Sequence, residues 1–468
     1  MSDVAEFELS QAGERVTGHG LDAWFAEARE LLKLAGPLVI TQLAQMAIMT
    51  TDVVMLSRLG KSALASAALG NTVFFFTWLI GCGPVAAVSP MIAHILGATP
   101  SDRAGVRAAT RMGFWAVLIL SVPLLGFLLM ARHTLLFFGQ TPELARGAGV
   151  FVTALCIGLP FSLGYQVLRN FSTALSKPNA SLWVMAFAIG FNAIMDYALI
   201  FGHFGAPRLG LMGSGIASAS SYTFSFLAML VVVWLTPSLR KYRIFRRFQR
   251  PHWEKLMEVF RLGMPIGLTM IFEAMLFNSA TLLMGTFGMA YVAAHQIAIN
   301  VPSITFMVPL GIGMAATVRV GLAAGAGDGE AVRRAGHVAI LMGGGFMTVT
   351  SILLWVFPDR IAGLYFADAA ANADVIVLAI AFLHVAAAFQ IFDGLQVVAA
   401  LSLRGLKDAR APMWIAGASY WLAGFPTCLL FAFTFHLKGL GVWIGLAFGL
   451  LVAAAAMCTR FWYLSRAR

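Results

Sequence analysis

Long apolar runs, separated by short polar connectors, recur along the whole chain of 468 residues. A helical run of about 20 apolar residues is long enough to cross the hydrocarbon core of a bilayer. The pattern predicts twelve such spans. Their expected ranges are 33–57, 68–98, 108–131, 148–174, 181–203, 212–236, 257–286, 291–324, 336–357, 373–403, 411–435 and 439–463. We therefore expect an all-α polytopic membrane protein with about 12 transmembrane helices.

The two halves of the chain repeat each other at a shift of 228 residues, the difference between positions 37 and 265. This shift places Pro37 on Pro265 and Thr41 on Thr269. After a slip of two residues, "YQVLRNFSTALSK" aligns with "LQVVAALSLRGLK". Apolar composition alone would not hold proline, glutamine and lysine in one register, so we infer a duplication.

Each half holds six spans, and because six is even, both copies begin on the same side of the membrane. We therefore expect two homologous six-helix bundles, arranged as parallel repeats around a central cavity. Two facing bundles describe a transporter that works by alternating access more naturally than a pore or an enzyme, although that step is an analogy.

Composition and charge agree with a membrane protein. The chain is 60% hydrophobic and 11% charged, with a mean hydropathy of +0.83, whereas soluble domains carry about 25% charged residues. The net charge of +11 would suit a nucleic-acid partner, but the basic residues cluster in short connectors, which is the pattern that orients membrane proteins. With both termini in the cytoplasm, only seven of the 32 Lys and Arg lie outside, so we expect that orientation and no nucleic-acid partner.

Charge also divides the chain into segments. Residues 1–32 start acidic, lack the pattern of a cleaved signal peptide, and are expected to form a cytoplasmic amphipathic N-terminal segment. The N-lobe follows over 33–236, and the C-lobe covers 257–468. Between them, 237–256 contains "SLRKYRIFRRFQRPHWEK" and is expected to be a basic cytoplasmic linker.

Four carboxylates fall well inside predicted spans: Asp52, Asp196, Glu273 and Asp393. An ionised carboxylate in a membrane helix costs at least roughly 2.5 kcal/mol. At the shift of the repeat, Asp52 corresponds to an alanine and Glu273 to a glutamine, so the scaffold does not require either acid to fold. The alternative is that each acid is a structural polar group bonded between helices. We give this less weight because no basic residue well inside a span stands out as a partner.

Spacing groups several polar residues of the N-lobe. Asn192 and Asp196 are four apart, on one helical face, and so are Ser214 and Ser218, which glycines accompany. Together with Asp52, these oxygens would suit a small hard cation such as Na⁺. The same acids could instead carry a proton, because burial disfavours the charged form of a carboxylate. Asn192 and Ser218 by themselves are also typical of residues that bond membrane helices together.

Motifs for other chemistry are missing from the sequence. There is no Walker motif, HExxH or nucleophile elbow, which argues against an ATP-driven pump, a hydrolase or an intramembrane lipid enzyme. The four cysteines lie in apolar segments without metal-binding spacing. His295 is best interpreted as a packing or interhelical hydrogen-bonding residue. We expect no enzyme activity and no cofactor beyond a coupling ion.

Several stretches resemble one family across essentially the whole chain. "GPLVITQ", "TTDVVMLSRLG", "FEAMLFNSATLLMG", "VRVGLAAGAGD" and "DGLQVVAALSLRGLKDARAP" look like those of the MATE (multidrug and toxic compound extrusion) transporters, especially the bacterial NorM-type branch. The resemblance implies an antiporter of the cell inner membrane that expels cationic, amphipathic drugs and dyes in exchange for Na⁺ or H⁺. We expect it to act as a monomer, with membrane lipid as its surroundings.

The resemblance also implies site residues. The N-lobe cation site of the family matches Asp52, Asn192 and Asp196, with Ser218 where threonine is expected. The C-lobe acids match Glu273 and Asp393, which would bind coupling ion or substrate. One turn before Asp393 a tyrosine is expected and Phe389 stands instead, which removes a possible cation ligand.

One rival within transport is a flippase for lipid-linked precursors, because related proteins share the two-lobe layout. Such a protein needs a cavity rich in Arg and Lys to hold pyrophosphate, and the predicted spans lack central basic residues.

Overall fold

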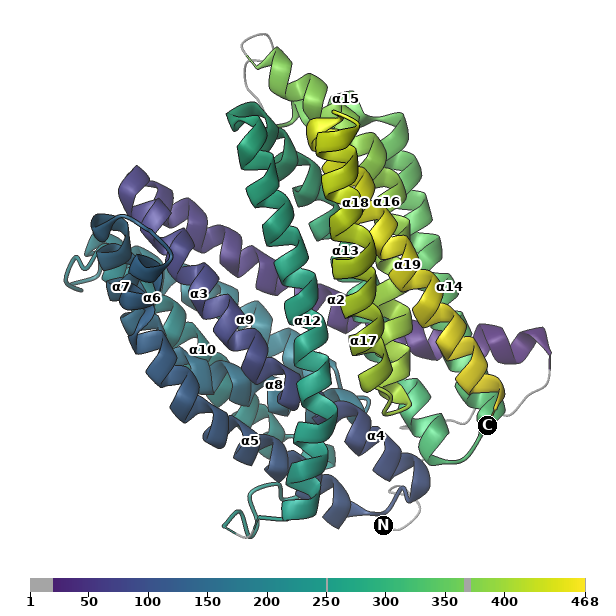
Figure 1. The fold of residues 1–468 in the computed structure, drawn as a ribbon. Helices are drawn as coiled ribbons and strands as arrows, with labels where there is room; N and C mark the ends of the chain where they lie inside the picture. Colours follow the sequence, from purple (N-terminus) through teal and green to yellow (C-terminus); the bar gives the residue numbers. More distant parts are fainter. Residues whose placement is uncertain (1–19, 250, 366–371, 468) are drawn as a thin grey trace. The chain divides into compact units, whose positions relative to one another are not determined.

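The computed structural model describes residues 20–249, 251–365 and 372–467, and every regular element in them is a helix. Within these ranges, eleven helices are long and apolar enough to span a membrane. A twelfth span arises if α7 (Pro142–Leu155) and α8 (Gly158–Ala174) are counted as one helix bent by 49°. This bend falls inside the predicted span 148–174. The predicted all-α architecture with about 12 spans is therefore confirmed (Figure 1).

By its internal contacts, the described chain forms two compact units. Among the described residues, unit 1 contains 20–39 together with those from 268 onward, and unit 2 contains those between 40 and 267. Both divisions fall inside long helices, α2 (Leu21–Ser57) and α12 (Trp253–Phe287). The first turns of α2 therefore pack with unit 1, and the first turns of α12 pack with unit 2.

Unit 2 is a helical bundle in which neighbouring spans lie side by side (Figure 1). Its helix α10 (Leu211–Leu235) packs on α9 (Asn179–Phe201), α8 and α7, while α3 (Lys61–Ala86) packs on α7, α8 and α5 (Arg103–Leu129). The shorter elements of this unit are α4 (Val88–Ala98), α6 (Ala131–Phe137) and α11 (Pro237–Arg240). Gly215 permits the close approach of α10 to α7, because a Cβ at this position would lie 2.6 Å from the carbonyl oxygen of Phe151.

Unit 1 is built around α13 (Met289–Gly325) and α16 (Ala373–Gly405), which pack on each other and on α14 (Gly329–Val356). Helix α19 (Lys438–Arg466) packs along α16, as Figure 1 shows. Between α17 (Arg410–Ala418), α18 (Phe425–Leu429) and α19, the chain widens into two π-helical segments, η1 (Ser419–Gly424) and η2 (Leu430–Thr434). The short helix α15 (Pro358–Gly363) follows α14. Large buried side chains, among them Trp443 and Phe382, fill the interior of this unit.

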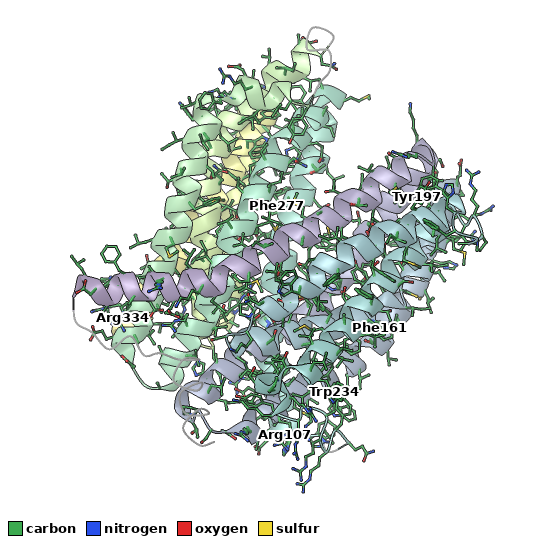
Figure 2. All side chains as sticks on the ribbon, turned by 180° about the vertical axis from the view of Figure 1, so that it is seen from behind. Arg107, Phe161, Tyr197, Trp234, Phe277 and Arg334 are labelled. Atoms are coloured by element: carbon green, nitrogen blue, oxygen red, sulfur yellow. The ribbon has the colours of Figure 1, made fainter. Side chains whose placement is uncertain are left out.

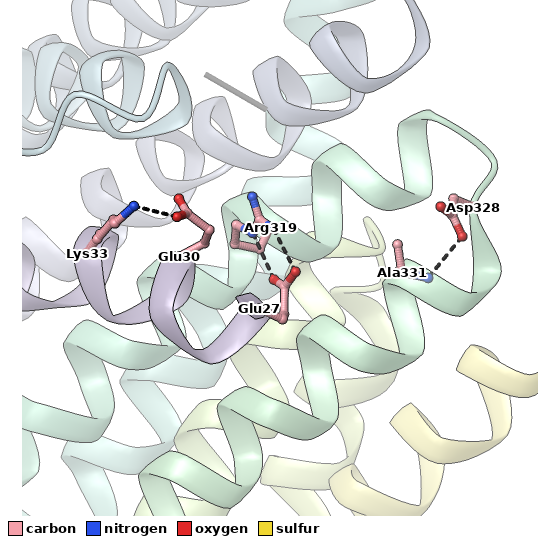
Figure 3. Close-up of polar contacts among 6 residues, drawn as sticks. All are labelled: Glu27, Glu30, Lys33, Arg319, Asp328 and Ala331. Atoms are coloured by element: carbon pink, nitrogen blue, oxygen red, sulfur yellow. Dashed lines mark hydrogen bonds and ion pairs between the residues drawn. The ribbon is translucent and has the colours of Figure 1, made fainter. Parts of the chain in front are cut away.

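A buried ion pair holds the start of α2 in unit 1. The Arg319 guanidinium of α13 donates two hydrogen bonds to the Glu27 carboxylate, at 2.8 and 2.6 Å (Figure 3). Glu27 is only 2% exposed. One turn further along α2, Lys33 donates to Glu30 at 2.6 Å on a more exposed surface (Figure 3). Because the two hydrogen bonds are parallel and the pair is buried, the pair fixes the orientation of α2 relative to α13 as well as their contact.

Candidate functional site

The four predicted N-lobe residues come together inside unit 2. The Ser218 hydroxyl of α10 donates a hydrogen bond of 3.2 Å to Oδ2 of Asp52 on α2. Asn192 and Asp196, one turn apart on α9, also interact with the Asp52 carboxylate. The helical spacing of Asn192 and Asp196 therefore does present both side chains to one point, as the sequence predicts.

Most polar atoms of this group have no hydrogen-bond partner among the described residues. The atoms without a partner are Oδ1 of Asp52, both carboxylate oxygens of Asp196, and the amide nitrogen and oxygen of Asn192. Asn192 and Asp196 are fully buried, and Asp52 is half-buried. Buried polar groups are almost always satisfied in folded proteins, so a cluster of unpaired atoms indicates a place where something else binds.

Neighbouring polar side chains do not compensate the acids. The hydroxyls of Thr50 and Thr51 donate to carbonyls of their own helix, at 3.0 and 2.9 Å. The Ser214 hydroxyl is also buried, without a partner in the described part of the chain. Tyr222 is a neighbour that the sequence analysis did not assign, and it interacts electrostatically with Asp52. Its position one turn beyond Ser218 on α10 is the signal that would have found it.

The two predicted C-lobe acids also meet, inside unit 1. Glu273 of α12 and Asp393 of α16 interact as like charges. Asp393 is 5% exposed, and its Oδ1 has no hydrogen-bond partner among the residues described. Arg404, near the end of α16, attracts the Glu273 carboxylate. This basic neighbour is absent from the sequence analysis, which found no obvious partner for the acids.

The surroundings of Asp393 are largely aromatic. Phe389, one turn earlier on α16, packs edge-on against Trp443 at 5.4 Å and against Phe277 at 5.9 Å, measured between ring centroids. His295 is fully buried, and its Nε2 lies 3.1 Å from the Thr281 hydroxyl of α12. This contact joins α13 to α12, which fits the predicted interhelical role of His295.

The chemistry of both groups is that of oxygen ligands around negative charge. In the described residues, no cluster of three or more His, Cys, Asp and Glu could hold a metal ion, so a zinc-type centre has no support there. Each group instead brings together two carboxylates, and the group in unit 2 adds the neutral side chains of Asn192 and Ser218. Two carboxylates in an apolar bundle are stabilised by a hard cation or by protons.

Comparison with known proteins agrees with the repeat. The MatE family model matches the chain twice, over residues 37–198 and 265–430, which is more than half of its length. The two matches begin at the same separation as the shift found in the sequence, which confirms the two homologous halves.

Two bacterial relatives match nearly end to end. A "Probable multidrug resistance protein NorM" from Mesorhizobium japonicum is 44% identical over 441 residues, covering 94% of both chains. A protein of the same name from Brucella suis is 42% identical over 439 residues, covering 94% of this chain and 93% of that one. Among solved structures, the eukaryotic MATE transporter AtDTX14 has a TM-score of 0.82 at 22% identity, covering 95% of this chain and 98% of that one. At that identity the likeness shows the fold alone.

Fold and comparisons together define a multi-pass helical membrane transporter rather than an enzyme. The chain belongs to the MatE family, and within it to the bacterial NorM-type transporters.

Proposed function

We propose that this protein is a multidrug efflux antiporter, which exports organic cationic, amphipathic drugs and dyes in exchange for Na⁺ or H⁺. It acts as a monomer in the inner membrane, with both termini in the cytoplasm. The relatives from Mesorhizobium japonicum and Brucella suis are named as multidrug resistance proteins, which supports drugs as the substrate class.

One observation carries the proposal. The carboxylate of Asp196 is fully buried beside Asp52, and neither of its oxygens has a hydrogen-bond donor among the described residues. Two carboxylates held side by side in an apolar bundle, without a basic partner, are strongly unfavourable when both are ionised. A cation or a proton would relieve this cost, and so would a positively charged drug. The proposed Na⁺ ligands in unit 2 are Asp52, Asn192 and Asp196, with Ser218.

Exchange follows from competition for the same negative groups. Entry of the coupling ion from outside neutralises the carboxylates and displaces the cationic drug. After the protein turns inward, release of the ion restores the negative charge, which then binds drug from the cytoplasm. A ligand shifts such an equilibrium only if it binds the two states unequally, and neutralisation of the acids supplies that difference.

The buried arginines argue against the flippase alternative. A pyrophosphate-binding cavity needs basic groups that are available to a ligand. Arg111 instead donates to the carbonyls of Arg246 and Arg247 at 3.1 and 2.6 Å, and Arg169 donates to Gln42 at 2.7 Å. These two arginines are therefore already engaged within unit 2, through one nitrogen each.

The placement of basic residues in unit 2 supports the proposed orientation. Figure 2 shows Arg107, in the first turns of α5, and Trp234, at the end of α10, toward one end of this unit, with Tyr197 of α9 toward the other. The first end carries the arginine-rich connector after α10. Such clustering at one membrane face is typical of the cytoplasmic side.

Drug efflux from whole cells tests the proposal. Asp52→Asn, Glu273→Gln and Asp393→Asn are each expected to abolish ethidium or fluoroquinolone efflux, while the protein still reaches the membrane. Thr50→Val is the matched control, because the Thr50 hydroxyl bonds only its own helix in the structure. Wild-type efflux rates in all three acid variants would refute the proposal.

A further inference from the structure

The interior of unit 1 holds a tyrosine that neither the repeat nor the acid pair explains. Tyr420 is fully buried, and its hydroxyl has no hydrogen-bond partner among the described residues. A buried hydroxyl without a partner is costly, and replacing it by an apolar group of the same shape is often neutral or favourable. The oxygen is therefore not explained by the stability of this unit alone.

The chain geometry brings Tyr420 to the acids. Helix α17, which leads into Tyr420, lies against α12 beside Glu273, because a Cβ added at Gly417 would lie 3.2 Å from the ring of Phe272. Tyr420 interacts electrostatically with both Glu273 and Asp393. One unpaired hydroxyl oxygen thus lies within electrostatic reach of two carboxylates that come from different helices.

Tyr420 lies in a widened segment of its helix. Tyr420 is the second residue of the π-helical segment η1. A π-helical segment changes the register of the side chains that follow it, and such segments are frequent at functional sites. On the other side, Gly424 lies against Gly449 of α19, where a Cβ at Gly424 would be 3.0 Å from the Gly449 Cα. This close approach gives the widened segment room inside the bundle.

In the turn of α16 that precedes Asp393, the one neutral side-chain oxygen is already engaged, because Oε1 of Gln390 accepts a hydrogen bond of 3.2 Å from Thr305. Phe389, in the same turn, has a ring that is 2% exposed and packed on Trp443 and on Phe277, which Figure 2 labels. Two carboxylates alone would neutralise a small cation but would leave part of its coordination shell without protein ligands. A hydroxyl at the same point adds one ligand without adding charge.

We propose that the Tyr420 hydroxyl is the third protein oxygen ligand of a Na⁺ ion bound between Glu273 and Asp393. A phenolic hydroxyl suits such a site, since its oxygen has two lone pairs to offer. In the structure it has no hydrogen-bond partner among the described residues, so no such bond has to break when the ion enters. In the loaded state a lone pair of the oxygen faces the cation. The inference rests on the proposed antiport and selects Na⁺ for the site in unit 1.

Equilibrium binding of radioactive Na⁺ to the purified full-length protein tests the assignment. The measurement is made in an Asp52→Asn background, which removes one of the two carboxylates of the proposed site in unit 2. The Na⁺ binding that remains is then attributed to unit 1. In that background, Tyr420→Phe is expected to weaken Na⁺ binding by about tenfold, as for loss of one ligand to a charged group. Tyr291→Phe is the matched control, because its ring contacts Phe287 and Phe382, and it is expected to leave the affinity unchanged.

Two further measurements separate ligation from damage to the fold. Without Na⁺, Tyr420→Phe should unfold at the same temperature as its parent or higher, whereas the stabilisation gained on adding Na⁺ should shrink, because ligand-induced stabilisation follows affinity. Adding Phe389→Tyr to Tyr420→Phe places a hydroxyl one turn before Asp393 and should restore part of the Na⁺ affinity.

The possible results decide separately on this inference and on the antiport itself. Unchanged Na⁺ affinity in Tyr420→Phe overturns the inference. So does a parent protein that binds no Na⁺ and exports dye on a pH gradient alone, a result that leaves the antiport intact. If neither gradient drives export, the proposed antiport fails, and the Na⁺-binding series still decides whether Tyr420 is a ligand.

Discussion

Replacing Asp196 by asparagine should make the protein more stable and inactive at the same time. An ionised carboxylate at the centre of a membrane helix costs roughly 2.5–3.5 kcal/mol. Asp196 lies five residues before the end of α9 at Phe201, so this value is an upper limit, but the residue is fully buried and neither of its oxygens finds a donor in the described residues. A neutral amide at the same place, also unpaired, costs about 1–3 kcal/mol. The net gain for Asp196→Asn is therefore at most about 1 kcal/mol.

Thermal unfolding in detergent without coupling ion, alongside dye transport, measures both halves of this prediction. We expect a raised unfolding midpoint for Asp196→Asn and no transport above background. Asp374→Asn is the control, because Asp374 is exposed near the start of α16 and its loss should change stability by less than about 0.5 kcal/mol. A clear loss of stability in Asp196→Asn would show that the acid holds helices together, and retained transport would show that it is not part of the ion site. Either result refutes the reasoning.

Three other predictions concern an ion pair, a helix contact and the orientation in the membrane. Glu27→Gln breaks a buried bidentate ion pair and should destabilise unit 1 by about 3–5 kcal/mol in thermal unfolding. Glu30→Gln, which breaks the more exposed pair, should cost at most about 1 kcal/mol. Equal losses of stability in the two variants would contradict this. Gly215→Ala pushes α10 away from α7 and should lower the stability of the protein by about 1–3 kcal/mol. Gly190→Ala, whose added Cβ has nothing within 4 Å, should leave the stability unchanged. Unchanged stability in Gly215→Ala would contradict this prediction. A cysteine at Gln249 should react with an impermeant maleimide only from the cytoplasmic side, and labelling in intact cells would reverse the proposed orientation.

Hydropathy and helical spacing predict much of this molecule. Bilayer thickness fixes the length of a span, so the apolar runs give the number of helices, and the bend between α7 and α8 is a detail inside one of them. The register of the repeat is also visible in the structure, because Pro37 and Pro265 each lie inside the first long helix of their half, α2 and α12. The grouping of Asn192 with Asp196 needs only the helical period. Their meeting with Asp52 and Ser218 was a hypothesis about packing, and the structure brings these residues together.

What the sequence could not give depends on contacts between distant segments. The π-helical segment that contains Tyr420 departs from the usual helical period, on which sequence-based prediction relies. The approach of Arg404 to Glu273 joins two helices far apart in the chain. The contact-based divisions inside α2 and α12 fall within helices and not at polar connectors, so composition gives no signal for them.

Dye transport by the purified protein in proteoliposomes, with a Na⁺ gradient and a pH gradient imposed separately, tests the central claim most directly. The claim is that buried carboxylates couple an inward ion flow to outward movement of a cationic drug. We predict ethidium export driven by at least one gradient, abolished when that gradient is dissipated and absent in Asp196→Asn. Export that persists without either gradient, or that Asp196→Asn leaves unchanged, would contradict the claim.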